Sequence, residues 1–273
     1  MLEKVEIRTD SGTLLTLPLT DYSEGYILEN VDGLDPVDAQ LVYSSFAQQD
    51  GTQYQSAQRE NRFLTFIIGF EPNYVSTSVR DLRRRLYNFL MPKSNVRLRF
   101  YEDDGLVVEI AGRVEKHQAP RFTKDPDATV NITCNLPDFV DLTPVTISGN
   151  TTAGTGTTDH NYLGSSETGL LFQMTVDRSI SGFTIYNSPA DNTLRSLIFA
   201  TPMVSGDTIK ISTVPGDKYA LLTHLGVESS VLYGVNSASE WLKLYQGINQ
   251  LRVSLAGAVI PWTIDYTTKY GGL

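Results

Sequence analysis

The sequence has very little cysteine. Cys134 is the only one in 273 residues, so no disulfide can form within the chain. Synthesis and folding in a reducing cytosol fit this composition best. Cys134 lies in the alternating run Ala128–Cys134, where a free cysteine usually behaves as a small buried hydrophobe. A nucleophilic role is not supported, because no nearby residue supplies a histidine or a positive environment.

Long hydrophobic runs are also missing. No stretch approaches the roughly 18 apolar residues of a membrane-spanning helix, so the sequence predicts no membrane insertion. The N-terminal ten residues (MLEKVEIRTD) have charges throughout and no apolar core, unlike a secretory signal. A protein of this kind working outside a cell would leave by another route, such as release inside a virion on lysis.

Motifs for chemistry are absent as well. The three histidines, His117, His160 and His224, are far apart and have no metal-ligand spacing. The acidic Glu102–Gly105 segment is typical of a hairpin turn, and the glycines of Gly154–Gly156 lack the context of a phosphate-binding loop. Paired carboxylates for glycoside cleavage are defined by their spatial separation, and no local pattern selects two. We therefore expect no catalytic residue, no cofactor and no metal, and no enzyme activity.

Positive charge is in deficit. The net charge is −9, which gives no global electrostatic reason to bind nucleic acid. The chain instead has 14 Tyr, 11 Phe and 21 Gly with few helical patterns, a composition that favours β structure. Its length suggests two domains.

The first half is predicted to be β-rich with one helix and one hairpin. The apolar run Phe63–Phe70 reads as a central strand, and the Glu102–Gly105 turn joins two alternating strands. Ser78 and Asp81 form a capping-box pair, apolar residues follow at helical spacing, and Pro92 ends the helix.

The exposed face of this helix has the strongest local charge, from Arg80, Arg83, Arg84 and Arg85. Three interpretations remain open: a phosphate-binding face, an ordinary solvated face, or a surface for ion pairs between subunits. These four arginines are our interface candidates.

The segment 141–169 is rich in Ser, Thr and Gly, which predicts that it contains the domain boundary, or long exposed loops at that boundary. About eight short strands follow without helices, as in a β-sandwich or jelly roll. The predicted domains are therefore 1–140 and 141–273. Trp241 and Trp262, in the last strands, are candidates for glycan or protein docking, although such aromatics are more often core or interface anchors.

The order of landmarks in the first half resembles the N-terminal belt domain of siphophage distal tail (Dit) proteins. The matching features are the central strand Phe63–Phe70, the basic helix closed by Met91-Pro92-Lys93, the hairpin VRLRFYEDDG, and Cys134 followed by Pro137 and Phe139. The second half resembles their galectin-like C-terminal domain. Its features are GDTIKI at Gly206–Ile211, LYQGIN at Leu244–Asn249, and the closing run from Ile264 to Leu273.

The resemblance implies a mainly β fold, with a sandwich-like belt domain and a galectin-like jelly-roll sandwich. It also implies a structural role in the distal tail or baseplate of a long-tailed bacteriophage. Such proteins form a homo-hexameric ring that joins the tail tube protein to the tail-tip hub and provides a docking platform for receptor-binding proteins in host attachment. DNA only passes through the ring lumen, and the protein is made in the host bacterial cytoplasm before it enters the virion tail tip. The alternative is a carbohydrate-binding β-sandwich that recognises host surface glycan.

Overall fold

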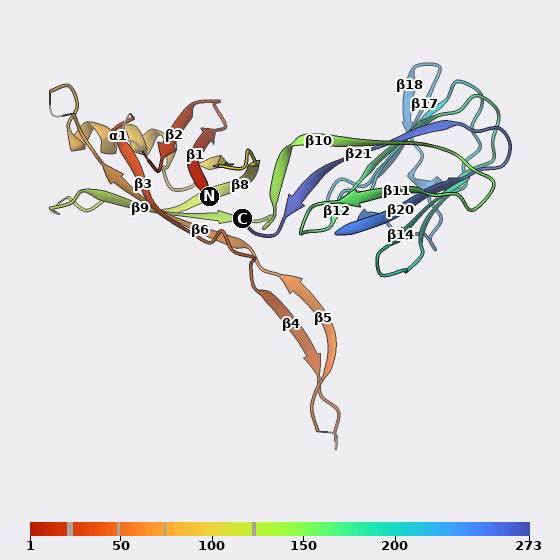
Figure 1. Cartoon of the computed structure of the whole chain (residues 1–273), viewed down its shortest axis with the longest axis horizontal. Helices are drawn as coiled ribbons and strands as arrows, with labels where there is room; N and C mark the ends of the chain where they lie inside the picture. Colours follow the sequence, from red (N-terminus) through yellow and green to blue (C-terminus); the bar gives the residue numbers. More distant parts are fainter. Residues whose placement is uncertain (21–23, 48–49, 74, 122–123) are drawn as a thin grey trace. The chain divides into compact units, whose positions relative to one another are not determined.

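The computed structural model describes residues 1–20, 24–47, 50–73, 75–121 and 124–273. The chain forms two compact units (Figure 1). The first contains Met1–Leu142 and Tyr270–Leu273, and the second contains Thr143–Lys269. The expected boundary after residue 140 lies within two residues of this division. The last four residues, which the sequence had placed in the second domain, pack with the first.

The first unit is an antiparallel sheet that folds around one core. The strands that build it are β1 (Leu2–Thr9), β2 (Leu14–Pro18), β3 (Tyr26–Asp32), β6 (Arg62–Phe70), β7 (Asn95–Glu102), β8 (Val107–Gln118), β9 (Asp127–Cys134) and the start of β10 (Phe139–Asn150). Strand β8 pairs with β7 over its first half and with β9 over its second, with a register shift between Val114 and Lys116. A register shift of this kind bends a strand, so β8 continues from the part of the sheet that it forms with β7 into the part that it forms with β9.

Every second side chain along the strands points into the core of this unit. In β9, Ala128, Val130, Ile132 and Cys134 all point inward. Burial raises the pKa of the Cys134 thiol to about 11, so this cysteine is an inert core residue, as expected. Strand β6 pairs with both β3 and β9, which confirms its predicted central position.

The predicted helix is α1, Val79–Phe89. Ser78 is its N-cap, and the capping box with Asp81 is present in both directions. Leu82 and Leu86 of the helix, with Leu90 at its C-cap, are buried in the core of the unit. Leu90 caps the C-terminal end, two residues before Pro92.

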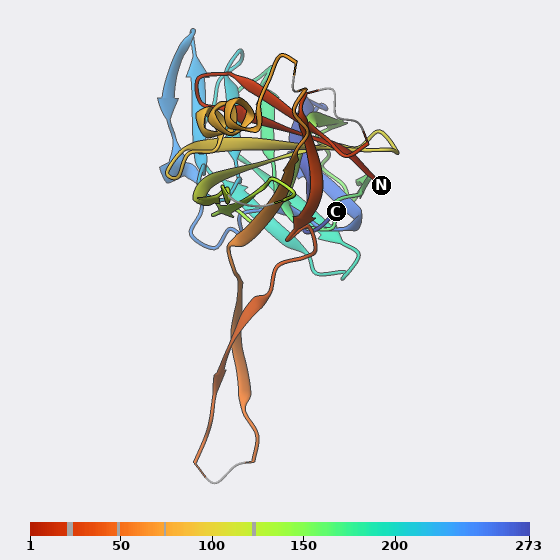
Figure 2. The same ribbon diagram turned by 90° about the vertical axis from the view of Figure 1, so that its left-hand side faces the viewer.

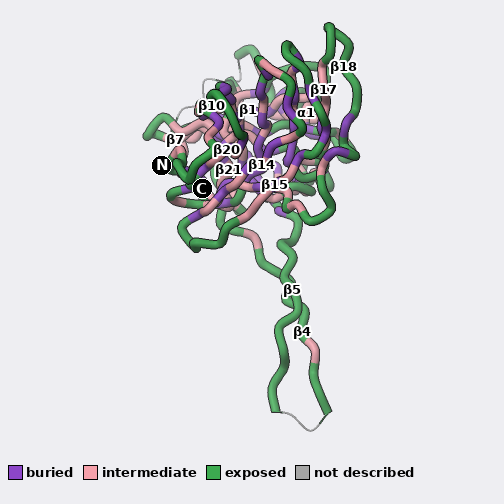
Figure 3. Tube along the Cα trace, turned by 90° about the vertical axis from the view of Figure 1, so that its right-hand side faces the viewer, coloured by how far each residue is buried: buried purple, intermediate pink, exposed green. Residues whose placement is uncertain are grey.

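A long hairpin, the arm, extends from this unit (Figure 2). It consists of β4 (Ala39–Ser44) and β5 (Gln53–Arg59), which pair with each other and with no other described strand. Every residue of β5 and all but one residue of β4 are exposed, as the burial colouring of Figure 3 shows. The run LVYSSF at 41–46 predicts a strand that overlaps β4, whereas no pattern within 53–59 predicts β5.

The second unit is a β-sandwich, which confirms the predicted class. One sheet has the order β18-β17-β16-β13-β21-β10, and the other has the order β11-β20-β14-β15. Their apolar faces enclose one core. The strands are β11 (Thr158–Tyr162), β13 (Leu171–Thr175), β14 (Phe183–Pro189), β15 (Arg195–Phe199), β16 (Thr208–Ser212), β17 (Tyr219–His224), β18 (Val227–Ser230), β20 (Gly247–Ser254) and β21 (Pro261–Tyr270). A short pair, β12 (Thr168–Gly169) and β19 (Lys243–Leu244), and the single turn η1 (Leu232–Gly234) complete the unit.

The prediction of exposed loops over 141–169 is wrong in part. Strand β10 runs to Asn150, and β11 and β12 lie within the same segment. Ile147 and Tyr162 anchor it in the core, although Ser, Thr and Gly dominate its composition. Among the described residues, no helix is long and apolar enough to cross a membrane.

Candidate assembly surfaces

The arm is fixed to the first unit at its root. The amide of Glu60 donates to the carbonyl of Asp38, which closes the base of the hairpin. The Arg59 guanidinium donates two hydrogen bonds to the carboxylate of Asp138, at 2.5 and 2.9 Å. A two-pronged arginine–carboxylate contact constrains orientation as well as distance, so the last residue of β5 is held firmly.

Arg62, just beyond the arm, is fully buried. Its guanidinium lies 4.3 Å above the Phe139 ring. It donates hydrogen bonds to the backbone carbonyls of Gly33, Asp35, Pro137 and Gly271. Burial lowers the pKa of this guanidinium, but the pKa of an arginine starts so high that the group stays charged. One side chain therefore joins the arm root, the segment before β10 and the C-terminal residues.

The arm exposes apolar side chains along its length. About half of each of the following side chains is accessible: Leu41, Val42, Tyr43, Phe46 and Tyr54. Tyr43 and Tyr54 are paired across the strands, with ring centroids 6.2 Å apart. Asp50 is the only charged residue between Ala39 and Gln58. A two-stranded hairpin is marginally stable by itself in water, and aromatic, charge-poor surfaces are typical of protein interfaces.

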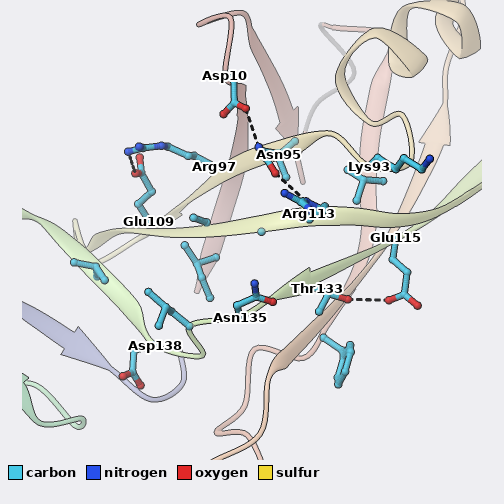
Figure 4. Close-up of a pocket in the computed structure, with 18 of the residues that line it drawn as sticks. Asp10, Lys93, Asn95, Arg97, Glu109, Arg113, Glu115, Thr133, Asn135 and Asp138 are labelled. Carbon is cyan, nitrogen blue, oxygen red and sulfur yellow. Dashed lines mark hydrogen bonds and ion pairs between the residues drawn. The ribbon is translucent and has the colours of Figure 1, made fainter. Parts of the chain in front are cut away.

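A groove of about 1380 Å³ lies on the outer face of the sheet in the same unit. Its floor is β8, and β7, the start of β6 and the segment after β9 form its walls (Figure 4). The apolar side chains Phe63, Leu136 and Leu142 are exposed there. The groove was not predicted, because outward-facing positions on strands far apart in sequence form it.

Polar contacts within the groove satisfy most of its charged groups. Arg97 donates to Glu109 at 3.2 Å, and Thr133 donates to Glu115 at 2.8 Å (Figure 4). Asn95 links two further charged groups: its amide donates to Asp10 and its oxygen accepts from Arg113, both at 3.0 Å. An occupant of the groove therefore does not need to bring charges of its own.

The arginines of α1 do not act as one set. Arg83 donates to the carbonyl of Pro120 and is half-buried, and Arg85 donates to Glu24 at 3.0 Å. Arg80 and Arg84 are exposed and lie one turn apart on the same face. The predicted four-arginine surface is thus reduced to two fully presented side chains, whose role in an interface remains a proposal.

The capping box of α1 gives a direct test of local stability. The Ser78 hydroxyl accepts from the amide of Asp81, and the Asp81 carboxylate accepts from the Ser78 amide at 3.2 Å. Replacing Ser78 with alanine should lower the free energy of unfolding of the first unit by about 1 kcal/mol, because an N-terminal amide loses its partner. Urea denaturation measures this loss. Ser76→Ala, outside the cap, is the matched control and should change stability by much less.

The two tryptophans named as docking candidates have different surroundings. Trp262 is 2% exposed and packs against Phe172, with ring centroids 6.4 Å apart. A Cβ on Gly149 would collide with the Trp262 ring, so the strand backbone lies directly against it. Trp241 is only half-buried, and the Lys218 ammonium lies 5.2 Å from its ring centroid. The two rings therefore do not form an exposed platform for a sugar.

The histidines have separate surroundings. His117 contacts the carbonyl of Leu90, His160 contacts the hydroxyl of Tyr266, and His224 contacts the Asp207 carboxylate at 2.6 Å. Among the described residues, no cluster of three or more His, Cys, Asp or Glu side chains has the geometry of a metal site.

The chain consists of two β-rich units. The sequence matches no family model and no curated protein. The structure is similar to the crystal structure of the Dit protein (gp 19.1) of phage SPP1, described as a paradigm of the hub adsorption apparatus in phages that infect Gram-positive bacteria. The TM-score is 0.66 at 15% sequence identity, over 97% of this chain and 98% of that one. Two structures of the activated phage p2 baseplate, with Sr and with Ca, align along nearly the whole chain at TM-scores of 0.46 and identities of 11% and 10%.

The resemblance to Dit proteins is confirmed at the level of fold. The SPP1 match spans both units.

Proposed function

We propose that this chain is a structural subunit of the distal tail of a long-tailed bacteriophage, and not an enzyme. Six copies form a ring between the tail tube and the tail-tip hub, with the first unit as the belt and the second as an outward docking domain. The observation that supports this most strongly is the match in fold to SPP1 Dit over nearly the whole of both chains. The exposed arm is consistent with this role, because it presents an apolar surface in need of a partner.

The test is the assembly state of the purified protein. Light-scattering mass and negative-stain images should show a closed ring, either of the protein alone or after the tail tube protein is added. A closed ring of identical subunits needs a head-to-tail interface, in which two different surfaces of each copy meet. A strict monomer at high concentration that also fails to assemble on the tube protein would contradict the proposal.

A further inference from the structure

The two sheets of the second unit have edge strands that differ in how they are covered. A loop lies along β15, where the Asn236 amide donates to the Ile198 carbonyl at 2.9 Å. The Glu240 amide donates to the Ser196 carbonyl of the same strand at 2.8 Å. Strand β18 is the edge of the other sheet, and among the described strands it pairs with β17 alone (Figure 1). All its residues, Val227–Ser230, are exposed, so its outer edge is open to a further strand.

The ladder between β17 and β18 shows which backbone groups face outward. The Val231 amide donates to the Ala220 carbonyl at 2.8 Å, and the register of the hairpin continues from this pair. Residues of an antiparallel strand bond alternately to one side and to the other. Ser229 therefore bonds to β17, whereas the N–H and C=O groups of Glu228 and Ser230 point away from it. These outward groups are aligned to form the ladder of an added strand.

The turn of this hairpin presents an apolar side chain from an unfavourable backbone conformation. Leu225 and Gly226 have φ angles of +48° and +79°, as in a type I′ turn. The first position of such a turn is usually Asn, Asp or Gly, because a Cβ atom is unfavourable there. Leu225 is also 89% exposed. The unit gains neither burial nor a relaxed backbone from this leucine, which points to a contact outside the unit.

Exposed apolar side chains lie at both ends of the open edge. Leu225 and Val227 are at the turn, and Leu232 and Tyr233 are in η1, directly after β18. Glu228 is the only charged residue between Leu225 and Tyr233. An extended segment of about six residues, roughly 20 Å long, spans this strip. The matching segment is therefore apolar at both ends and basic at the residue that faces Glu228.

We infer that β18 accepts an extended segment of another protein as an added strand. This inference rests on the proposed docking role of the second unit, and it gives that role a surface and a partner chemistry. The backbone ladder of an added strand supplies affinity, and its alternate side chains supply specificity. A second copy of this chain is a poorer occupant, because two β18 strands paired edge to edge place their Glu228 carboxylates on the same face of the joint sheet.

Two pools of fluorescein-labelled peptides of this length test the charge complementarity. Each peptide has Leu or Tyr at both ends and Val, Ile or Thr at the inner positions. The central residue is Lys in one pool and Glu in the other. Fluorescence anisotropy with the full chain should show saturable binding of the lysine pool, at least about fivefold tighter than that of the glutamate pool. Glu228→Lys should reverse this preference.

Ser230→Pro tests the backbone ladder. This substitution removes an outward N–H and leaves the bonds to β17 in place, and edge strands tolerate proline. We expect the lysine pool to bind at least about tenfold more weakly, with unchanged thermal unfolding. Ser230→Ala keeps the amide and is the matched control, which should bind normally. Leu225→Asn suits the turn, so it should weaken binding about threefold without lowering thermal stability.

The outcomes separate the strand site from the other proposals. Equal binding of the lysine pool to Ser230→Pro and Ser230→Ala, or no saturable binding of either pool, would overturn the strand site. A dimer of the chain that Ser230→Pro dissociates would overturn it in favour of self-pairing. Ring formation should be the same in all these variants. Absent rings with intact peptide binding would contradict the proposed ring and leave the strand site standing.

Discussion

A protein with the substitutions Leu41→Thr, Val42→Thr and Phe46→Ser should remain folded but lose ring assembly. The three side chains are 47%, 49% and 55% exposed, so the folded monomer gains little from them. Threonine preserves the strand propensity of β4. Covering the exposed part of each side chain in an interface is worth about 1 kcal/mol, so their loss should weaken each contact by about 3 kcal/mol, or about 100-fold in Kd.

The measurement is sedimentation velocity across a concentration series, with urea denaturation to follow the fold. The matched control is Val227→Thr with Ile248→Thr, which removes apolar side chains that are 69% and 53% exposed from β18 and β20 of the second unit. This control should form rings normally. Equal loss of assembly in both proteins would mean that general surface hydrophobicity, and not the arm, holds the subunits together.

The features that were predicted correctly depend on local chemistry. The capping box of Ser78 and Asp81, the turn at Glu102–Gly105 and the alternating strand ending at Cys134 are each specified within a few residues. A tertiary environment can override such signals, but in these segments it agrees with them. The mainly β class with a single long helix follows from the same signals.

The missed features depend on contacts between distant segments. Strand β5 is too polar to predict as a strand, because β4 is its only partner among the described strands and neither of its faces is covered. Burial of Trp262 follows from its packing on Phe172 and Gly149, which precede it by about 90 and 113 residues. No local pattern shows that the C-terminal residues return to the first unit, since that return is made by contacts with distant residues, among them the hydrogen bonds from Arg62 to Gly271 and from Leu273 to Leu34.

Replacing Arg62 with methionine should destabilise the first unit by at least about 3 kcal/mol. Methionine fills similar space but leaves the carbonyls of Gly33, Asp35, Pro137 and Gly271 without their donor. A hydrogen bond to a charged group is worth about 1.5–3 kcal/mol, and a buried acceptor left unpaired adds the cost of its desolvation. The stability of Arg62→Lys should lie between that of the unchanged protein and that of Arg62→Met. A single ammonium group lacks the forked geometry of a guanidinium and cannot reach all four carbonyls.

The effect should also be local, which separates it from general unfolding. Hydrogen exchange should accelerate at the arm root and at Gly271–Leu273, where the Leu273 amide donates to the Leu34 carbonyl. Strands of the second unit should exchange as before, since their core is separate. Arg113→Met, an exposed arginine on the adjoining sheet face, is the matched control and should change stability by no more than about 0.5 kcal/mol. If Arg62→Met is as stable as this control, the four carbonyl contacts do not hold the arm, and its orientation must depend on Arg59 and Asp138 alone.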